Sequence, residues 1–375
     1  MKPWSWVLCA MLCGALCVGC SADSSDDDAA DDDISDDDVD DDTDDDLDDD
    51  VDDDVDDDID DDTDDDVDDD SADDDSALSW SPMTSGTSAD LYGVWGSSAT
   101  DVFAVGFDEV SLGGVILHYD GSSWSKMTIP PSTTLVSVWG SSSSDVFAVD
   151  DHGGILYYDG SGWSAQTKDV KGEGDMGAGV WGSSPSDVFY VCWIVILHYD
   201  GFSWSPGNDN GIYEAIWMNS VWGTSGTDVF VAGWSFVAEG IPVAGVVLHY
   251  DGISWSTIWS GSATDFPDSV WGASSTDVFV VCDGGGLILH YNGSSWSVTH
   301  EASTRLYGVW GSSNSNVFAV GEDETNAGVI WHYNGASWSP MPSGATDKPL
   351  YGVWGSSATD VFAVGYGGTI LHYGD

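Results

Sequence analysis

The sequence is short of positive charge. Six lysines and arginines stand against 67 aspartates and glutamates, which gives the 375 residues a formal net charge of −61 at pH 7. A single arginine, Arg305, is present. Proteins that hold a nucleic-acid backbone do so with clustered lysine and arginine. We therefore expect no nucleic-acid partner.

Cysteine is also scarce outside the first twenty residues. Four of the six cysteines lie at positions 9, 13, 17 and 20, which leaves Cys192 and Cys282 for the rest of the chain. Two cysteines cannot supply a disulfide framework. We expect both to be small, unpaired core residues.

Residues 1–20, "MKPWSWVLCAMLCGALCVGC", contain an apolar run too short to cross a bilayer as a retained helix. One lysine, the apolar run and a small-residue end are typical of a signal peptide. The final "CVGC" resembles the bacterial lipobox, with Cys17 where that motif usually has leucine. The resemblance implies that Cys20 is lipid-modified and anchors the protein to a membrane of the bacterial cell envelope. Ser21, in place of an aspartate, implies the outer membrane or the cell surface; simple secretion is the alternative.

Residues 21–76 contain 37 aspartates and no lysine or arginine, mostly as three aspartates followed by one other residue. Aspartate is a poor residue for a helix interior, and neighbouring like charges repel. We expect a disordered, extended linker. It would serve as a spacer or, alternatively, as a weak calcium-binding segment or an export signal. The acidic loops of the remaining chain are a second place where weak calcium binding is an alternative, and no other cofactor is expected.

Residues 77–375 repeat a unit of the form "VWGSSxxDVFAVG…GxILHYDGxxWS". The stretch "LYGVWGSSATDVFAVG" occurs unchanged at 91–106 and at 350–365. The first tryptophan of the unit recurs seven times, at intervals of 39 to 49 residues, as Trp95, Trp139, Trp181, Trp222, Trp271, Trp310 and Trp354. Repeats of this length are typical of propeller blades.

Each unit contains four short runs rich in β-branched and aromatic residues, separated by glycine, serine and aspartate. No segment has a helical apolar period, so the fold class is all-β. We predict a seven-bladed β-propeller with four antiparallel strands per blade, over residues 77–375. The seventh unit lacks its fourth run, whereas "LSWSPM" (78–83) stands alone before the first unit. The prediction is that this N-terminal strand completes the C-terminal blade and closes the ring.

The repeat resembles those of propeller lipoproteins on bacterial surfaces, and "GxILHYDGSSW" loosely resembles the Asp-box of sialidase-type propellers and kelch-like repeats. The resemblance implies the fold only, because one residue fewer separates the aspartate from the tryptophan than in an Asp-box. Sialidase chemistry would also require an arginine cluster, and Arg305 stands alone.

Two positions of the repeat carry side chains that are common in metal and catalytic sites. Histidine occupies one repeat position in six units, and aspartate or asparagine precedes "VF" in all seven. A metal ring is unfavourable, because equivalent residues of separate blades lie too far apart. We interpret the aspartates as turn residues that bind backbone amides.

Candidate site residues lie in the connections whose length varies, from the second to the third strand and from blade to blade. In a propeller these emerge on one face, and function on repeat folds usually resides in irregular loops. The extra aromatic residues there are Tyr213, Trp217, Trp234, Phe236 and Trp259, and the extra acids are Asp108, Glu109, Asp150, Asp151, Glu239, Glu322, Asp323 and Glu324. Aromatic platforms with polar rims suit glycan or protein ligands; the alternative is that long loops bury their own aromatics.

The function predicted on these grounds is a cell-envelope binding or adhesion module for a glycan or protein ligand, acting as a monomeric propeller and not as an enzyme. A polysaccharide-acting hydrolase or lyase that uses two loop carboxylates is one alternative. A structural envelope protein without a specific ligand is another.

Overall fold

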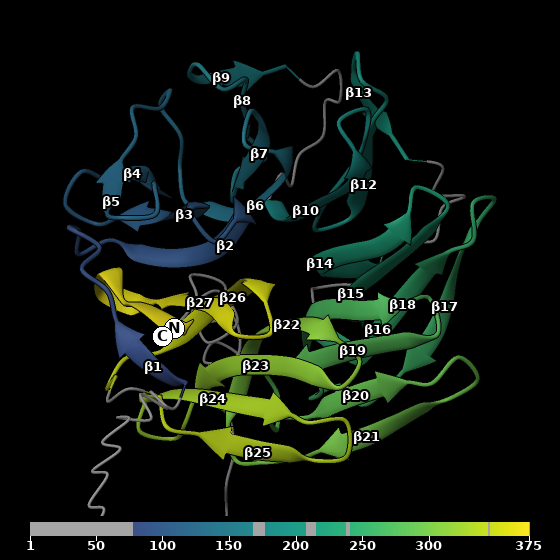
Figure 1. The fold of residues 1–375 in the computed structure, drawn as a ribbon. Helices are drawn as coiled ribbons and strands as arrows, with labels where there is room; N and C mark the ends of the chain where they lie inside the picture. The colour runs from purple at the N-terminus through teal and green to yellow at the C-terminus, as the bar shows by residue number, and fades with distance from the viewer. Residues whose placement is uncertain (1–77, 168–176, 208–214, 238–240, 344–345, 375) are drawn as a thin grey trace, which may run out of the picture. The chain divides into compact units, whose positions relative to one another are not determined.

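The computed structural model describes residues 78–167, 177–207, 215–237, 241–343 and 346–374. These residues form seven four-stranded antiparallel sheets arranged around an axis (Figure 1), which confirms the predicted seven-bladed propeller. The predicted signal peptide, Cys20, the aspartate-rich segment, Tyr213 and Glu239 lie outside the described residues. No helix in the described part of the chain is long and apolar enough to cross a membrane.

The first three blades follow the order of the sequence from the axis outward. Their strands are β2 (Asp90–Ser98), β3 (Asp101–Asp108), β4 (Gly113–Tyr119) and β5 (Trp124–Lys126); β6 (Leu135–Ser142), β7 (Asp145–Asp150), β8 (Ile155–Tyr158) and β9 (Trp163–Gln166); and β10 (Gly177–Ser184), β11 (Asp187–Cys192), β12 (Val195–Tyr199) and β13 (Trp204–Pro206).

Blades four to seven repeat the pattern. Their strands are β14 (Ile216–Ser225), β15 (Asp228–Val237), β16 (Ile241–Tyr250) and β17 (Trp255–Ser260); β18 (Pro267–Ser274), β19 (Asp277–Cys282), β20 (Ile288–Tyr291) and β21 (Trp296–His300); β22 (Arg305–Ser313), β23 (Asn316–Glu322), β24 (Gly328–Tyr333) and β25 (Trp338–Met341); and β26 (Leu350–Ser357), β27 (Asp360–Gly365) and β28 (Ile370–Gly374) with β1 (Ser79–Pro82). A single turn of 3-10 helix, η2 (Tyr366–Gly368), precedes β28.

The ring is closed by the two ends of the described chain. Strand β1 lies beside the C-terminal strands of the chain (Figure 1). It pairs antiparallel with β28, and Trp80 is opposite Tyr373. The Trp80 side chain is 5% exposed and its ring lies 5.3 Å from that of Tyr373 and 6.0 Å from that of Phe318 in blade six. The isolated "LSWSPM" segment is therefore the outermost strand of blade seven, as predicted.

The "VWG" of each repeat joins neighbouring blades. The tryptophan of one blade lies over the glycine of the next, so that a Cβ on Gly140 would be 2.6 Å from the Trp95 ring. Trp354 occupies the same place over Gly96, across the junction where the ring closes. A side chain at these glycines would displace the indole, which explains why the unit requires both residues.

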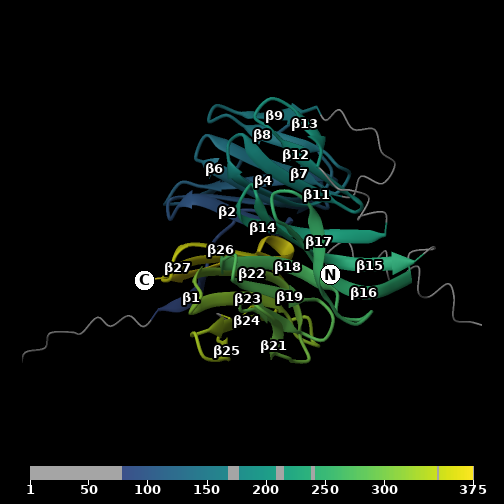
Figure 2. The ribbon, with the colours of Figure 1, turned by 90° about the vertical axis from the view of Figure 1, so that its right-hand side faces the viewer.

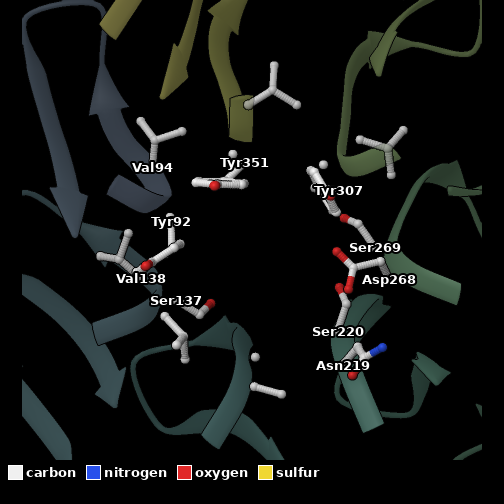
Figure 3. A pocket seen from close by; sticks show the side chains of 18 of the residues that line it. Tyr92, Val94, Ser137, Val138, Asn219, Ser220, Asp268, Ser269, Tyr307 and Tyr351 are labelled. Carbon is white, nitrogen blue, oxygen red and sulfur yellow. The ribbon is translucent and has the colours of Figure 1, made fainter. Parts of the chain in front are cut away.

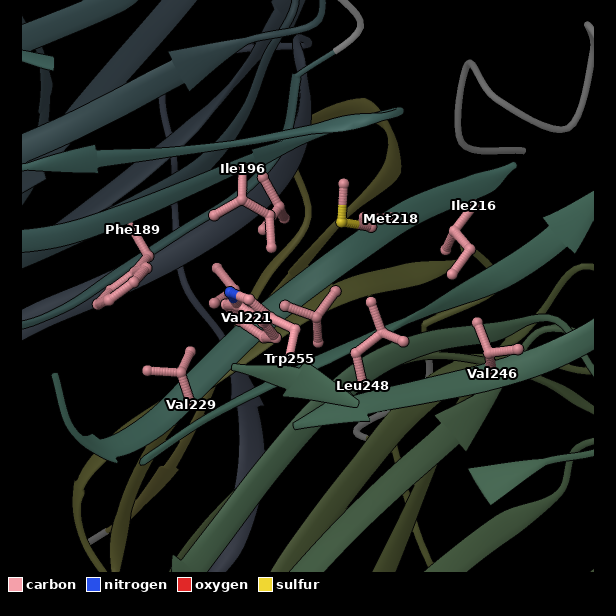
Figure 4. Packing of buried hydrophobic residues seen from close by; sticks show 11 residues of the cluster. Phe189, Ile196, Ile216, Met218, Val221, Val229, Val246, Leu248 and Trp255 are labelled. Carbon is pink, nitrogen blue, oxygen red and sulfur yellow. The ribbon is translucent and has the colours of Figure 1, made fainter. Parts of the chain in front are cut away.

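Apolar packing between blades forms the core. Between blades three and four, Phe189 and Ile196 face Met218, Val221 and Leu248 in one buried cluster (Figure 4). Equivalent clusters recur around the ring. Because each blade is covered on both faces, its middle strands are continuous apolar runs rather than alternating ones. Cys192 and Cys282 are buried thiols within these clusters.

The recurrent aspartates and histidines are structural partners within single blades. In blade one the Asp101 carboxylate accepts the Ser97 hydroxyl at 2.5 Å and lies 2.6 Å from His118 Nε2. The pairing recurs at 2.6 to 2.8 Å in blades three, four, five and seven. The aspartate that binds backbone amides is instead that of "HYDG": Asp120 accepts the amides of Ser122 and Ser123. The turn interpretation thus applies to a different aspartate of the unit.

Candidate functional site

A β-bulge recurs in the innermost strand of every blade. In blade one, Leu91 pairs with Gly106 and Gly93 with Val105, so Tyr92 is the extra residue. A bulge re-aims the side chain of its extra residue. The seven bulged residues are Tyr92, Val136, Ala178, Asn219, Asp268, Tyr307 and Tyr351.

All seven bulged residues line a central channel of about 140 Å³ (Figure 3). They lie near the start of the innermost strands, toward the face that carries the variable loops. The small residue that follows each bulge is packed against the next blade: a Cβ on Gly352 would be 2.9 Å from the Tyr92 carbonyl oxygen, and Ser137 Oγ accepts the Val180 amide at 3.3 Å. Crowding between the innermost strands therefore requires a small residue after the bulge in every repeat. The bulged residue itself does not meet this constraint, and its type varies.

Three tyrosines form one side of the channel. The rings of Tyr92 and Tyr351 lie 5.3 Å apart, and those of Tyr351 and Tyr307 lie 5.5 Å apart. Burial raises the pKa of all three phenols well above the ordinary value, and neighbouring carboxylates raise it further. The three hydroxyls are therefore neutral at any physiological pH.

Two carboxylates support the tyrosines from behind. Glu322 is 1% exposed, and its Oε1 accepts the Tyr307 hydroxyl at 2.8 Å and lies 3.6 Å from Arg305 Nη1. The other oxygen, Oε2, has no hydrogen-bond partner among the described residues. Asp90, beside Tyr92, accepts the Gly367 amide at 2.7 Å, and burial raises the pKa of its carboxyl.

Polar side chains occupy another side of the channel. The Asn219 amide donates to the Pro267 carbonyl at 2.9 Å, which ties blade four to blade five. Asp268 follows Pro267, and Figure 3 shows its carboxylate directed toward the open space of the channel. The remaining bulged residues, Val136 and Ala178, are small and apolar. The channel mouth is therefore asymmetric, although the scaffold around it repeats sevenfold.

The acidic residues predicted from sequence lie in separate loops and largely hold those loops in shape. Asp108 accepts the amides of Val110 and Ser111, and hydrogen bonds with Ser111 hold the pKa of its carboxyl low. The carboxylates of Asp150 and Asp323 likewise accept backbone amides of their own loops. Asp150 and Asp151 also accept the amides of Thr133 and Thr134, which lie in the loop between β5 and β6. Glu109 and Glu324 are exposed, and Glu322 is the predicted acid that hydrogen-bonds a residue of the channel.

The predicted aromatic residues cluster in blade four. Trp217 stacks on Trp193 with ring centroids 4.4 Å apart, and it contacts Trp234 at 4.1 Å and Phe236 at 5.1 Å. Trp234 is 5% exposed, and its ring packs against Trp217 and Phe266. Trp259 lies on the outer strand β17, half-buried beside Gly245 and Gly261.

The long hairpin of β15 and β16 carries exposed aliphatic side chains on top of this aromatic cluster. Its strands extend past those of the neighbouring blades (Figure 2). Val237, Ile241 and Val243 are 51%, 56% and 49% exposed, and Ile194 of blade three is 37% exposed. We call the three hairpin residues Val237, Ile241 and Val243 the hairpin patch. This loop stands out in the sequence by its length, but its aromatic residues, and not its aliphatic ones, were predicted to bind a ligand.

The bulged residues were missed by sequence reasoning. The signal was nevertheless present: in the aligned repeats, the residue two before the recurrent valine changes from Tyr to Val, Ala, Asn or Asp, whereas the residue that follows it is always Gly or Ser. A variable position next to one that is always small indicates a side chain that does not pack between the blades.

Comparisons with known proteins agree on the architecture. YCF48 bound to D1 peptide superposes with a TM-score of 0.59 at 15% identity, covering 79% of this chain and 97% of that one. A catalytically inactive virginiamycin B lyase from Staphylococcus aureus with quinupristin gives 0.62 at 12% identity, covering 79% and 98%. The WD40 β-propeller domain of Doa1 gives 0.60 at 13% identity, covering 80% and 98%.

At such identities the likeness shows the fold alone: residues 78–374 are a seven-bladed β-propeller. The sequence matches no family model, and the search of curated proteins also found no match.

Proposed function

We propose that this chain is a binding module of the bacterial cell envelope that holds a protein partner through the variable-loop face, chiefly through the hairpin patch. The observation that carries the proposal is the exposure of Val237, Ile241 and Val243 at the end of an extended hairpin. Contiguous exposed aliphatic side chains on a soluble domain commonly mark a protein interface.

The packing of the aromatic cluster favours a protein over a glycan. A sugar platform needs a tryptophan with an open face, whereas Trp217 is stacked on Trp193 and contacts Trp234. The cluster instead braces the hairpin from below. The side chains that remain accessible are aliphatic, and aliphatic surfaces are buried effectively against another protein.

The structural neighbours support binding as a use of this fold. One was solved with a peptide and another, a lyase made catalytically inactive, with quinupristin. For this chain we propose a role without catalysis, since Asp108, Asp150 and Asp323 accept backbone amides of their own loops. A loop carboxylate that already accepts backbone amides is a poor candidate for one of the two catalytic carboxylates of a polysaccharide hydrolase or lyase.

The hairpin proposal is tested by replacing two apolar side chains of the patch with charged ones. The full chain, immobilised, is screened against an array of purified proteins and a glycan array. We expect the screen to find protein ligands. Their affinity for the double variant Ile241→Asp/Val243→Asp should be at least about tenfold lower, because two apolar side chains are lost from the interface and two charges must be desolvated. Val298→Asp is the matched control, since Val298 is 55% exposed on β21, outside the patch. Glycan ligands alone, or equal losses in the control, would contradict the proposal.

We also propose that Cys20 anchors the protein, with residues 21–76 as an acidic spacer between membrane and propeller. The support is the signal-peptide pattern and the "CVGC" motif. Metabolic labelling of the protein with a fatty-acid analogue in a bacterial host should be lost in Cys20→Ala, and the variant should leave the membrane fraction. Equal labelling of Cys20→Ala and the parent would exclude this anchor.

A further inference from the structure

We propose that Met83, Met127 and Met341 are sites of reversible oxidation by peroxide, and that the propeller stays folded when all three are methionine sulfoxide. This modification goes beyond the proposed function and does not depend on the hairpin patch. It rests on three features of the described residues: the shared place of the three side chains in the repeat, their partial exposure, and the buried indole N–H groups beside them.

The three methionines occupy one position of the repeat. Each lies three residues after the tryptophan of an outermost strand, in "WSPM" (80–83), "WSKM" (124–127) and "WSPM" (338–341). Each is also held opposite an isoleucine of the third strand, in the pairs Met83–Ile370, Met127–Ile116 and Met341–Ile330. The side chains pack at three consecutive junctions of the ring, from blade six to blade two. The backbone therefore places all three in equivalent surroundings.

These side chains are more accessible than the fourth methionine of the described chain. Met83, Met127 and Met341 are half-buried, whereas Met218 is 0% exposed in the core between blades three and four. Peroxide must reach the sulfur atom before it can oxidise it. Met218 is therefore an internal control for the other three.

The repeat position of the methionines accepts a hydrogen bond from the next blade. Trp163 Nε1 donates to Met127 Sδ at 3.3 Å. In blade five the same position is Thr299, and its Oγ1 accepts the Trp338 indole N–H, also at 3.3 Å. A thioether sulfur is only a weak acceptor. Thr299 indicates that an oxygen atom can take its place in this contact.

Two further indole N–H groups beside the methionines have no acceptor. Trp124 packs in the same cluster as Met83, and Trp80 packs in the same cluster as Met341. Nε1 of both tryptophans is buried and has no hydrogen-bond partner among the described residues. A buried donor without a partner is unfavourable. An oxygen atom on the neighbouring sulfur would supply the acceptor that these indoles lack.

Oxidation places an oxygen atom on that sulfur. Hydrogen peroxide transfers one oxygen atom to the thioether: its O–O bond breaks, an S=O bond forms, the sulfur loses two electrons and the peroxide is reduced to water. The indole keeps its proton and donates it to the sulfoxide oxygen. A sulfoxide usually disrupts a core because it is polar, and methionine sulfoxide reductases restore the thioether. Here the sulfoxide is partly exposed and has a donor, so the blades remain packed.

The first test treats the full, folded chain with hydrogen peroxide and follows each methionine by peptide mass spectrometry. We expect each of the three sites to gain one oxygen atom at least about tenfold faster than Met218, which is reached only after local opening. The melting temperature should then lie within about 4 °C of that of the reduced protein. Oxidation of Met218 at an equal rate, or a larger loss of melting temperature, would overturn the proposal.

The second test asks whether the indole binds the sulfoxide. The variant Met83→Leu/Met341→Leu leaves Met127 as the half-buried methionine of the described chain, and Trp163→Phe is added to remove the N–H but keep an aromatic ring. Oxidation should lower the melting temperature by about 2–4 °C more with Trp163→Phe than without it, which corresponds to one hydrogen bond. Each variant is compared with its own reduced form, so destabilisation by the substitution itself cancels.

Trp204→Phe in the same background is the matched control. Trp204 is also a buried tryptophan of an outermost strand, but Gln166 occupies the methionine position of the preceding blade. Oxidation should therefore have the same effect with and without Trp204→Phe. An equal effect of oxidation with and without Trp163→Phe would show that the indole does not bind the sulfoxide, and the proposal would fail.

Discussion

Removing residues 77–84 should lower the melting temperature of the propeller by more than about 10 °C. Blade seven would lose its outer strand, and the Trp80 side chain, 5% exposed, would leave its place against Tyr373 and Phe318. Truncating a buried tryptophan alone costs about 3–5 kcal/mol. In a large domain each kcal/mol shifts the midpoint by about 2–4 °C. Thermal unfolding followed by tryptophan fluorescence measures the change.

A deletion of equal length within the aspartate run, residues 45–52, is the matched control and should leave the midpoint unchanged. Two point variants separate the contribution of the Trp80 side chain from that of a neighbouring exposed side chain. Trp80→Ala should account for most of it, whereas Ser81→Ala, whose side chain is exposed, should change the free energy of unfolding by less than about 0.5 kcal/mol. An unchanged midpoint after deletion of 77–84 would mean that β1 does not close the ring.

Replacing Gly140 by alanine should destabilise the protein by about 1–3 kcal/mol, which is typical of overpacking in a filled interior. The added Cβ would lie 2.6 Å from the Trp95 ring and 2.7 Å from the Asp145 carbonyl oxygen. The carbonyl belongs to the backbone and cannot move aside without disturbing the turn between β6 and β7. The free energy of unfolding, from urea denaturation, is the measurement.

Gly162→Ala is the control in the same blade. A Cβ at Gly162 would have no heavy atom within 4 Å, and its backbone lies outside the left-handed region. We expect no loss of stability, and a small gain because alanine restricts the unfolded chain. Similar losses in the two variants would show that the effect comes from the loss of glycine itself and not from contact with the indole of the previous blade.

The sequence predicted the architecture well because the fold is repetitive. Seven copies of "VWG", each followed by a strand similar to "DVFAV", give seven independent observations of the same packing, including the tryptophan that lies over the glycine of the next blade. The incomplete last unit and the isolated "LSWSPM" then determine how the ring closes. A repeated pattern therefore predicts the packing that all blades share, but it does not predict the features of one particular blade.

The candidate site was less predictable for the same reason. Trp217 and Trp234 attract attention because they depart from the repeat, but the structure packs them edge to face against each other. Asp108 and Asp323 were selected for their charge, but they accept amides of their own turns. Whether a loop side chain faces a ligand or its own backbone depends on loop conformation, which residue type does not specify.

The sequence by itself determined the class, the number of blades, the strand that closes the ring and the strong excess of negative charge. Each follows from local pattern and counting, which require no knowledge of distant contacts. The tertiary structure alone decided which side chains meet at the axis. Tyr92 and Asp268 are far apart in the chain, and a bulge in each innermost strand turns both into one channel. A bulge is a mismatch between paired strands, so it becomes visible only when the strands are seen together.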